Sequence, residues 1–168
     1  MVLVTGGTGL VGSHLLLHLI ENGESVRAIY RKLETIQKTK NLFSYYKKEN
    51  LFEKINWIEA DILDVPSLEI AFENVEYVYH CAAFVSDWGK REIFEQVMIN
   101  GTENVCRAAS EANVSRFVKI STNDVFGLRE DVVMDETFPL TPWNEPYPDT
   151  KLIAEEIAWK YYKEKNLP

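Results

Sequence analysis

Short apolar runs alternate with amphipathic stretches along most of the chain. The apolar runs have the length of buried strands and lie at Val2–Val4, Val26–Tyr30, Ile55–Ala60, Val75–His80 and Arg116–Ser121. The stretches between them predict helices at Ser13–Asn22, Pro66–Glu73, Arg91–Ala112 and Pro148–Glu164, and a partly helical surface segment at Leu33–Lys54. Strands that alternate with helices are typical of parallel sheets. The sequence therefore predicts an α/β fold, with a doubly wound, mostly parallel sheet and helices on both faces.

The carboxyl-terminal part of the sequence is less regular. Asp131–Pro146 is rich in proline and acidic residues and is expected to form a loop. The last predicted helix runs out at Asn166–Pro168, where the alternation calls for another strand. We therefore expect residues 1–168 to form one domain of a longer protein.

Composition and charge narrow the range of functions. The chain has 168 residues, 26 acidic against 18 basic side chains and a net charge of −8, so a nucleic-acid-binding surface is not expected. No apolar run reaches the roughly 18 residues that a membrane span needs. The only cysteines are Cys81 and Cys106, which fits a reducing compartment such as the cytoplasm.

A glycine-rich segment joins the first predicted strand to the first predicted helix. Gly6, Gly9 and Gly12 are spaced three apart, and Gly7 with Gly9 and Gly12 satisfies the pattern G-x-G-x-x-G. Such glycines allow a tight turn and a close approach of the backbone to a pyrophosphate, which the helix N-terminus also attracts. The strand before and the helix after favour dinucleotide binding over a purely structural turn.

The end of the second predicted strand bears on the choice of dinucleotide. A carboxylate there would bond the ribose hydroxyls and repel a 2′-phosphate. Instead, Tyr30 is followed by Arg31 and Lys32, so NADP(H) is the preferred cofactor and NAD(H) the alternative. Asp61, after the third strand, could accept a hydrogen bond from adenine or serve as a turn residue.

Three residues near the end of the chain suggest acid–base chemistry. Tyr147 and Lys151 are four residues apart at the start of a predicted helix, so they share one face. A nearby ammonium favours the phenolate and lowers the pKa of a tyrosine toward the working pH. Thr122 follows the fifth strand and could hydrogen-bond the oxygen of a carbonyl or alcohol substrate.

Taken together, the motifs resemble those of the extended short-chain dehydrogenases/reductases, the NAD(P)-dependent epimerase/dehydratase family. The matching segments are Thr5–Gly12, Asp61–Asp64, His80–Ala83, Gly101–Val105, Ser121–Gly127 and Tyr147–Lys151, in the family's order and spacing. The resemblance implies a Rossmann-type sheet and a nicotinamide cofactor. It implies that Tyr147 is the catalytic acid/base, that Lys151 lowers its pKa and that Thr122 contacts the substrate oxygen. It further implies cofactor contacts from Gly6, Gly9, Leu10, Val11, Gly12, Arg31, Asp61, Ile62, Ala82, Ala83, Tyr147 and Lys151.

The sequence departs from the family pattern in two respects. Family members usually carry an asparagine three residues before the Gly–Thr pair, where this chain has Met98. Asn100 lies about 200° further around a helix and does not simply replace it. Family members also continue into a C-terminal region that shapes the substrate pocket, and this sequence lacks it.

Other candidate residues were weighed against structural roles. His14 and His18 lack a third ligand, so no metal site is predicted. His80 is interpreted as a core or cofactor-side residue and Cys81 as a small buried hydrophobe. Trp88, in the loop Phe84–Lys90, lies where a substrate or the nicotinamide would approach.

Three functions remain open on the sequence. The first is hydride transfer between nicotinamide and a carbonyl/alcohol substrate, as in dihydroflavonol-reductase-like or hydroxysteroid-dehydrogenase-like members. The second is an NAD-dependent nucleotide-sugar epimerase or dehydratase, with Asp124 as an extra acid. The third is a cofactor-binding module without turnover. The resemblance also suggests a homodimer built from the helices at Arg91–Ala112 and Pro148–Glu164.

Overall fold

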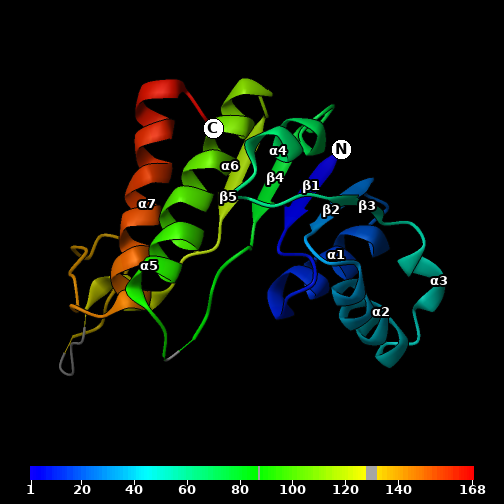
Figure 1. The fold of residues 1–168 in the computed structure, drawn as a ribbon, viewed down its shortest axis with the longest axis horizontal. Coiled ribbons are helices and arrows are strands. Elements are labelled where there is room, and N and C mark those ends of the chain that lie inside the picture. Colours follow the sequence, from blue (N-terminus) through cyan, green and yellow to red (C-terminus); the bar gives the residue numbers. More distant parts are fainter. Residues whose placement is uncertain (87, 128–131) are drawn as a thin grey trace.

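The computed structural model describes residues 1–86, 88–127 and 132–168. Its centre is a five-stranded parallel sheet with the strand order β3-β2-β1-β4-β5. The strands are β1 (Val2–Thr5), β2 (Val26–Tyr30), β3 (Asn56–Glu59), β4 (Tyr77–His80) and β5 (Arg116–Lys119). The chain extends the sheet from β1 first toward β3 and then, after crossing back, toward β5 (Figure 1). The predicted doubly wound sheet is therefore confirmed.

Both faces of the sheet are buried by helices. Side chains of a strand alternate between the faces, so Val2 and Val4 of β1 join one core cluster and Leu3 joins the other. The first face is covered by α1 (Leu10–Glu21), α2 (Ile36–Tyr45) and α3 (Glu49–Phe52), with a 3-10 turn, η1 (Leu33–Thr35), before α2. The second is covered by α4 (Val65–Ala71), α6 (Gly101–Glu111) and α7 (Pro146–Lys165).

The helical run that ends in α6 is divided by a change of backbone geometry. It begins with α5 (Arg91–Phe94), continues through a π-helical segment, η2 (Glu95–Asn100), and ends in α6. Figure 1 shows this run beside α7. The predicted helix Arg91–Ala112 therefore exists, but its middle turns are wider than those of an α-helix. A further 3-10 turn, η3 (Asn123–Phe126), follows β5.

Several predicted boundaries change for local reasons. Helix α1 begins at Leu10 rather than Ser13, because Gly9 ends the loop as the N-cap residue. Helix α7 begins at Pro146, a residue that suits a first turn, and ends at Lys165, after which Asn166 caps it in the left-handed region with a φ of 53°. Residues 132–145 belong to no helix or strand, as predicted for this loop, whereas Asp131 lies outside the described residues.

The carboxyl end of the chain lies beside β5. Leu167 is buried in the core, and the Phe117 N–H donates to the carbonyl oxygen of Pro168 at 2.7 Å. In the parts of the chain that the structure describes, no helix has the length and apolar character needed to cross a membrane.

Candidate active site

The loop between β1 and α1 brings its glycines into close contact with neighbouring backbone. Gly6 has a φ of +70°, and a Cβ there would lie 2.7 Å from the Ala82 nitrogen. At Gly12 a Cβ would lie 2.2 Å from the Gly6 carbonyl oxygen. The Gly9 N–H donates to that same oxygen at 3.0 Å. Side chains would fill this cradle, so the glycines leave the N-terminus of α1 open to a pyrophosphate.

Helix α2 holds the glycine loop from one side. Thr39 is fully buried, and its hydroxyl donates to the Gly7 carbonyl oxygen at 2.9 Å. Thr39 was not predicted from the sequence. Its burial could be suspected only because it lies one helical turn before the buried Phe43, and many polar residues in helices have an apolar residue at that spacing.

A cavity of about 330 Å³ opens beside the glycine loop. Of the predicted cofactor residues, those that line it are Gly6, Gly9, Arg31, Ile62, Ala82 and Ala83. The structure adds several residues that were not predicted, among them Thr8, Thr35, Lys38 and Val97. Leu10 and Val11 are instead exposed on the first turn of α1, while Gly12, Asp61, Tyr147 and Lys151 lie outside the lining.

Two basic side chains contribute to the lining of this cavity. Arg31 and Lys38 both line it, and none of its described lining residues is acidic. Asp61 lies next to it, where one carboxylate oxygen accepts from the Leu63 N–H at 3.0 Å and the other lies 4.0 Å from Arg31 Nη1. One oxygen of the Asp61 carboxylate thus holds the local turn, while the contact with adenine stays a prediction.

His80 lies in the core between the glycine loop and α6. Its Nδ1 is 2.7 Å from Thr5 Oγ1 and its Nε2 is 3.1 Å from Thr102 Oγ1. Thr5 Oγ1 also accepts from the Ala82 N–H at 3.2 Å. Burial, together with Lys119 and Lys151, lowers the pKa of His80 to about 3. The neutral ring therefore links the end of β1, α6 and, through Thr5, the segment after β4, beside the cavity at the glycine loop. This agrees with the core role expected for His80.

The three predicted catalytic residues lie where β5 ends and α7 begins. The Lys151 ammonium is buried and donates to the Ile120 carbonyl oxygen at 2.7 Å. The Thr122 hydroxyl donates to Asp124 Oδ2 at 3.0 Å and accepts from the Asp124 N–H at 3.3 Å. Tyr147 lies one turn before Lys151 on α7.

The pKa of Tyr147 is shifted in the direction opposite to the one predicted from the sequence. The pKa of Tyr147 is raised by burial and by the Asp124 carboxylate, while a hydrogen bond with Thr122 acts in the opposite direction. Burial in turn lowers the pKa of Lys151, against smaller contributions from Cys81 and Glu155. The pKa of Tyr147 is therefore shifted upward, opposite to the predicted direction, because burial and the Asp124 carboxylate outweigh the hydrogen bond with Thr122.

A second cavity, of about 440 Å³, contains Tyr147 in its lining. Asp124, Phe94 and Trp143 contribute to it, together with Val85, Ser86, Trp88 and Gly89 from the loop predicted to meet a substrate. Asp87 of that loop lies outside the described residues. This cavity places mostly apolar and aromatic side chains around the Tyr147 hydroxyl, which suits an organic substrate.

Met98 occupies a buried position in the π-helical segment. Its Sδ accepts from the Phe84 N–H at 3.2 Å, and the side chain is almost fully enclosed. The thioether therefore joins η2 to the loop after β4, at the position where the family usually carries asparagine. Sequence reasoning identified the departure but not this contact.

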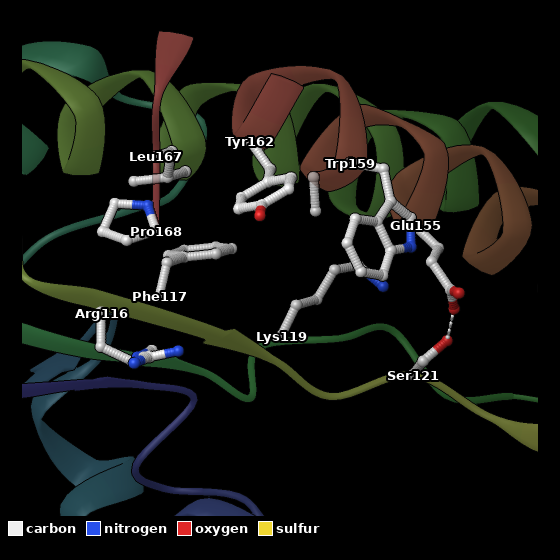
Figure 2. A pocket seen from close by; sticks show the side chains of 10 residues that line it. Arg116, Phe117, Lys119, Ser121, Glu155, Trp159, Tyr162, Leu167 and Pro168 are labelled. Carbon is white, nitrogen blue, oxygen red and sulfur yellow. Dashed lines mark hydrogen bonds between the residues drawn. The ribbon is translucent and has the colours of Figure 1, made fainter. Parts of the chain in front are cut away.

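A third hollow, a groove of about 460 Å³, separates the β5 edge from α7. Figure 2 shows Phe117 and Lys119 pointing from β5 toward Trp159 and Tyr162 on α7. The Ser121 hydroxyl donates to Glu155 at its rim. Lys119 Nζ is buried and has no hydrogen-bond partner among the described residues, and burial, reinforced by Lys151, lowers its pKa to about 8.

Comparisons with known proteins identify the family. The model of the NAD-dependent epimerase/dehydratase family matches residues 2–168. The human dTDP-D-glucose 4,6-dehydratase is 34% identical over 173 aligned residues, which cover 99% of this chain and 48% of that protein. A 3-beta-hydroxysteroid dehydrogenase of Mycolicibacterium neoaurum is 30% identical over 166 residues, which cover 94% of this chain and 42% of that one.

Solved structures agree with this assignment. The UDP-glucuronic acid 4-epimerase of Bacillus cereus, determined in complex with NAD, superposes with a TM-score of 0.80 at 28% identity, covering 99% of this chain and 54% of that chain. The chain therefore belongs to the NAD-dependent epimerase/dehydratase family, and the predicted resemblance is confirmed. It spans about half the length of the relatives it matches.

Proposed function

We propose that the protein is a nicotinamide-dependent oxidoreductase of the extended short-chain dehydrogenase type, acting on a carbonyl/alcohol pair. One observation carries the proposal: the glycine-loop cavity and the Tyr147 cavity are built at the same edge of the sheet. Gly6 after β1 and Cys81 after β4 line the first cavity, and Val85 after β4 and Asp124 after β5 line the second, all beyond the carboxyl ends of parallel strands. Lys151, one turn after Tyr147 on α7, reaches the same edge, because its ammonium donates to the Ile120 carbonyl oxygen just after β5.

The residues divide the proposed reaction between them. A bound nicotinamide supplies or accepts the hydride at its C4 atom. In the direction of reduction, the Tyr147 hydroxyl donates its proton to the carbonyl oxygen, so that a C=O group becomes CH–OH; in oxidation the proton returns. The Thr122 hydroxyl, which now donates to Asp124, turns to the same substrate oxygen. Lys151, whose ammonium lies at the end of β5, would bind a ribose hydroxyl of the bound nucleotide.

Tyr147→Phe tests the proton transfer. The variant lacks the transferable proton, so turnover is expected to fall at least about 100-fold, the scale of a lost general acid. Cofactor affinity, measured by fluorescence titration, should stay within about threefold, because the glycine-loop cavity is unchanged. Turnover is followed by nicotinamide absorbance with a panel of ketones and aldehydes. Tyr162→Phe, exposed on the same helix, is the control.

Two results would reject this mechanism. Retained activity in Tyr147→Phe would remove the phenol from the reaction. A wild-type chain that binds nucleotide with thermal stabilisation but turns over no carbonyl would instead support the alternative of a binding module without turnover.

The preferred cofactor is NADP(H). Support comes from Arg31 and Lys38 at the nucleotide end of the cavity and from its lack of acidic lining among the described residues. Two cations attract a 2′-phosphate, which a carboxylate would repel. NAD is the alternative, and NAD is the nucleotide in the complex of the Bacillus cereus epimerase.

Direct titration distinguishes the two nucleotides. NADPH is expected to bind at least about tenfold more tightly than NADH, and Arg31→Ala or Lys38→Ala should reduce only NADPH affinity. Lys40→Ala is a matched control, because Lys40 lies on the same helix but over the Phe52 ring. Equal or tighter binding of NADH would reject the preference.

A second candidate function is nucleotide-sugar epimerisation or dehydration with NAD. The observation that favours it is Asp124, whose carboxylate bonds to Thr122 and lines the Tyr147 cavity. A carboxylate in that place provides a second acid–base group beside the phenol. Conversion of a nucleotide sugar into a rearranged or dehydrated product, with no net oxidation of added NADH, would support this function over reduction of a carbonyl substrate.

The organisation of the whole protein follows from the same reasoning. Residues 1–168 form the dinucleotide-binding domain, and a separate substrate-binding part completes the Tyr147 cavity. The groove in Figure 2 offers room for a further strand under α7, beside β5, where Pro168 already accepts from the Phe117 N–H. We further propose that the protein forms a homodimer through α7 and the neighbouring helical run 91–111, which light scattering tests. We also propose a cytoplasmic location, which fractionation of cells tests.

A further inference from the structure

Asp149 is a buried carboxylate that the proposed chemistry does not use. It lies in the first turns of α7, two residues after Tyr147, and its side chain is only 9% exposed. Burying a carboxylate is costly unless hydrogen bonds or charges compensate it. Its partners therefore indicate what it holds in place.

Those partners come from the two segments that flank the start of α7. Asp149 Oδ1 accepts from the Trp143 N–H at 2.9 Å, and Oδ2 lies 3.7 Å from Arg91 Nη2 on α5. Arg91 in turn donates from Nε to Glu95 at 3.0 Å. The Asp149 N–H donates back to the Glu145 carbonyl oxygen at 3.2 Å. One residue thus bonds to both ends of the turn 143–145, while its carboxylate also faces α5.

The turn that Asp149 holds forms one side of the Tyr147 cavity. Trp143 and Glu145 line this cavity, and Phe94 lines it from α5. Between Trp143 and Glu145, Asn144 has a φ of 64°, a conformation that costs free energy for a residue with a side chain. Such a turn needs external hydrogen bonds to keep one conformation, and the Asp149 carboxylate supplies one to the backbone of Trp143.

We infer that Asp149 is a positioning residue that fixes Trp143 in the substrate-side wall of the Tyr147 cavity, with Arg91 joining α5 to the same wall. The inference rests on the proposed function, in which this cavity receives the substrate. It assigns to Asp149 no contact with a reacting atom. None of the described residues that line the glycine-loop cavity belongs to this network, so nucleotide binding is expected to be independent of it.

Amide hydrogen exchange, followed residue by residue by NMR, tests the contact directly. In the wild type the Trp143 amide is expected to be protected, and in Asp149→Ala it should exchange about tenfold faster or more. Asp149→Asn keeps an oxygen that can accept from the Trp143 N–H and should stay within about threefold of the wild type. Asp135→Ala is the matched control, because it removes a similar bond to the Thr137 N–H away from the cavity.

A second readout separates positioning from general stability. NADPH affinity should change less than about threefold in Asp149→Ala, whereas the 19F resonance of 5-fluorotryptophan at position 143, assigned with Trp143→Phe, should shift or split. With a carbonyl compound that the wild type turns over, KM should rise more than kcat falls.

Three outcomes would overturn the inference. They are an unprotected Trp143 amide in the wild type, unchanged Trp143 exchange in Asp149→Ala, and equal losses of NADPH affinity and Trp143 protection. The first decides the matter even if Asp149→Ala does not fold. Wild-type protein that fails to bind either nicotinamide nucleotide would refute the proposed function instead, with the Trp143 amide still protected.

Discussion

The buried His80 ring should make the stability of the protein depend on pH. The pKa of this imidazole is lowered from 6.5 to about 3, first by burial and then by Lys119 and Lys151. In the unfolded chain the ring takes up a proton near pH 6.5, whereas in the folded chain it stays neutral. The unfolded state thus binds more protons below pH 6.5, so stability is fully present above that pH and is lost as the pH falls toward 3.

The size of this effect follows from the pKa difference. Each pH unit between the two pKa values changes the free energy of unfolding by up to about 1.4 kcal/mol. Between pH 7 and pH 5 the loss from His80 alone amounts to about 2 kcal/mol, a large share of the roughly 5–15 kcal/mol typical of a domain.

Urea unfolding at pH 7 and pH 5, followed by circular dichroism, measures the loss. His80→Gln removes the titrating group, so the variant should be less stable at pH 7 but should lose about 2 kcal/mol less than the wild type between the two pH values. His14→Gln, on the exposed part of α1, is the matched control and should keep the full wild-type difference. Equal pH dependence in the wild type and His80→Gln would refute the argument, because the ring would then not be held neutral in the folded state.

Two further predictions concern the glycine loop. Gly12→Ala places a Cβ 2.2 Å from the Gly6 carbonyl oxygen, so it should cost about 1–3 kcal/mol of stability and abolish nucleotide binding in a fluorescence titration. Gly23→Ala, with nothing within 4 Å of the added Cβ, should retain binding, and retention by Gly12→Ala would contradict the cradle. Thr39→Val leaves the Gly7 carbonyl oxygen without its 2.9 Å partner and should lower the urea midpoint by the equivalent of about 1–3 kcal/mol. Thr39→Ser should restore most of this loss; if Thr39→Val is as stable as the wild type, the hydrogen bond does not support the loop.

The sequence predicted those features of the fold and the site that depend on a single helix, strand or loop. All five strands were predicted from their apolar runs, most simply β1 and β2, whose side chains are buried on both faces of the sheet. The glycine loop was found because its spacing is imposed by the turn itself. Tyr147 and Lys151 were placed on one helix face by their spacing alone, and the structure keeps them one turn apart.

The remaining features depend on how separate elements meet. Lys38 lines the cofactor cavity only because α2 packs against the glycine loop, and its spacing along the chain gives no sign of this. The pKa of Tyr147 is raised rather than lowered because α7 and its neighbours bury the phenol and bring Asp124 close to it. The π-helical segment could not be predicted from its amino-acid composition. It differs from an α-helix only in that each N–H bonds to a carbonyl oxygen one residue further back along the chain.

The wide turns of η2 determine how α5 is rotated about the helix axis relative to α6. A π-helical turn holds one more residue than an α-helical turn, so α5 is rotated by about 100° relative to where an unbroken helix would place it. Through this rotation Phe94 and Arg91 meet the Tyr147 side of the protein while Thr102 remains against His80. Deleting one residue from Glu95–Asn100 would therefore bring the two ends back into phase and turn the Arg91 side chain away from Asp149.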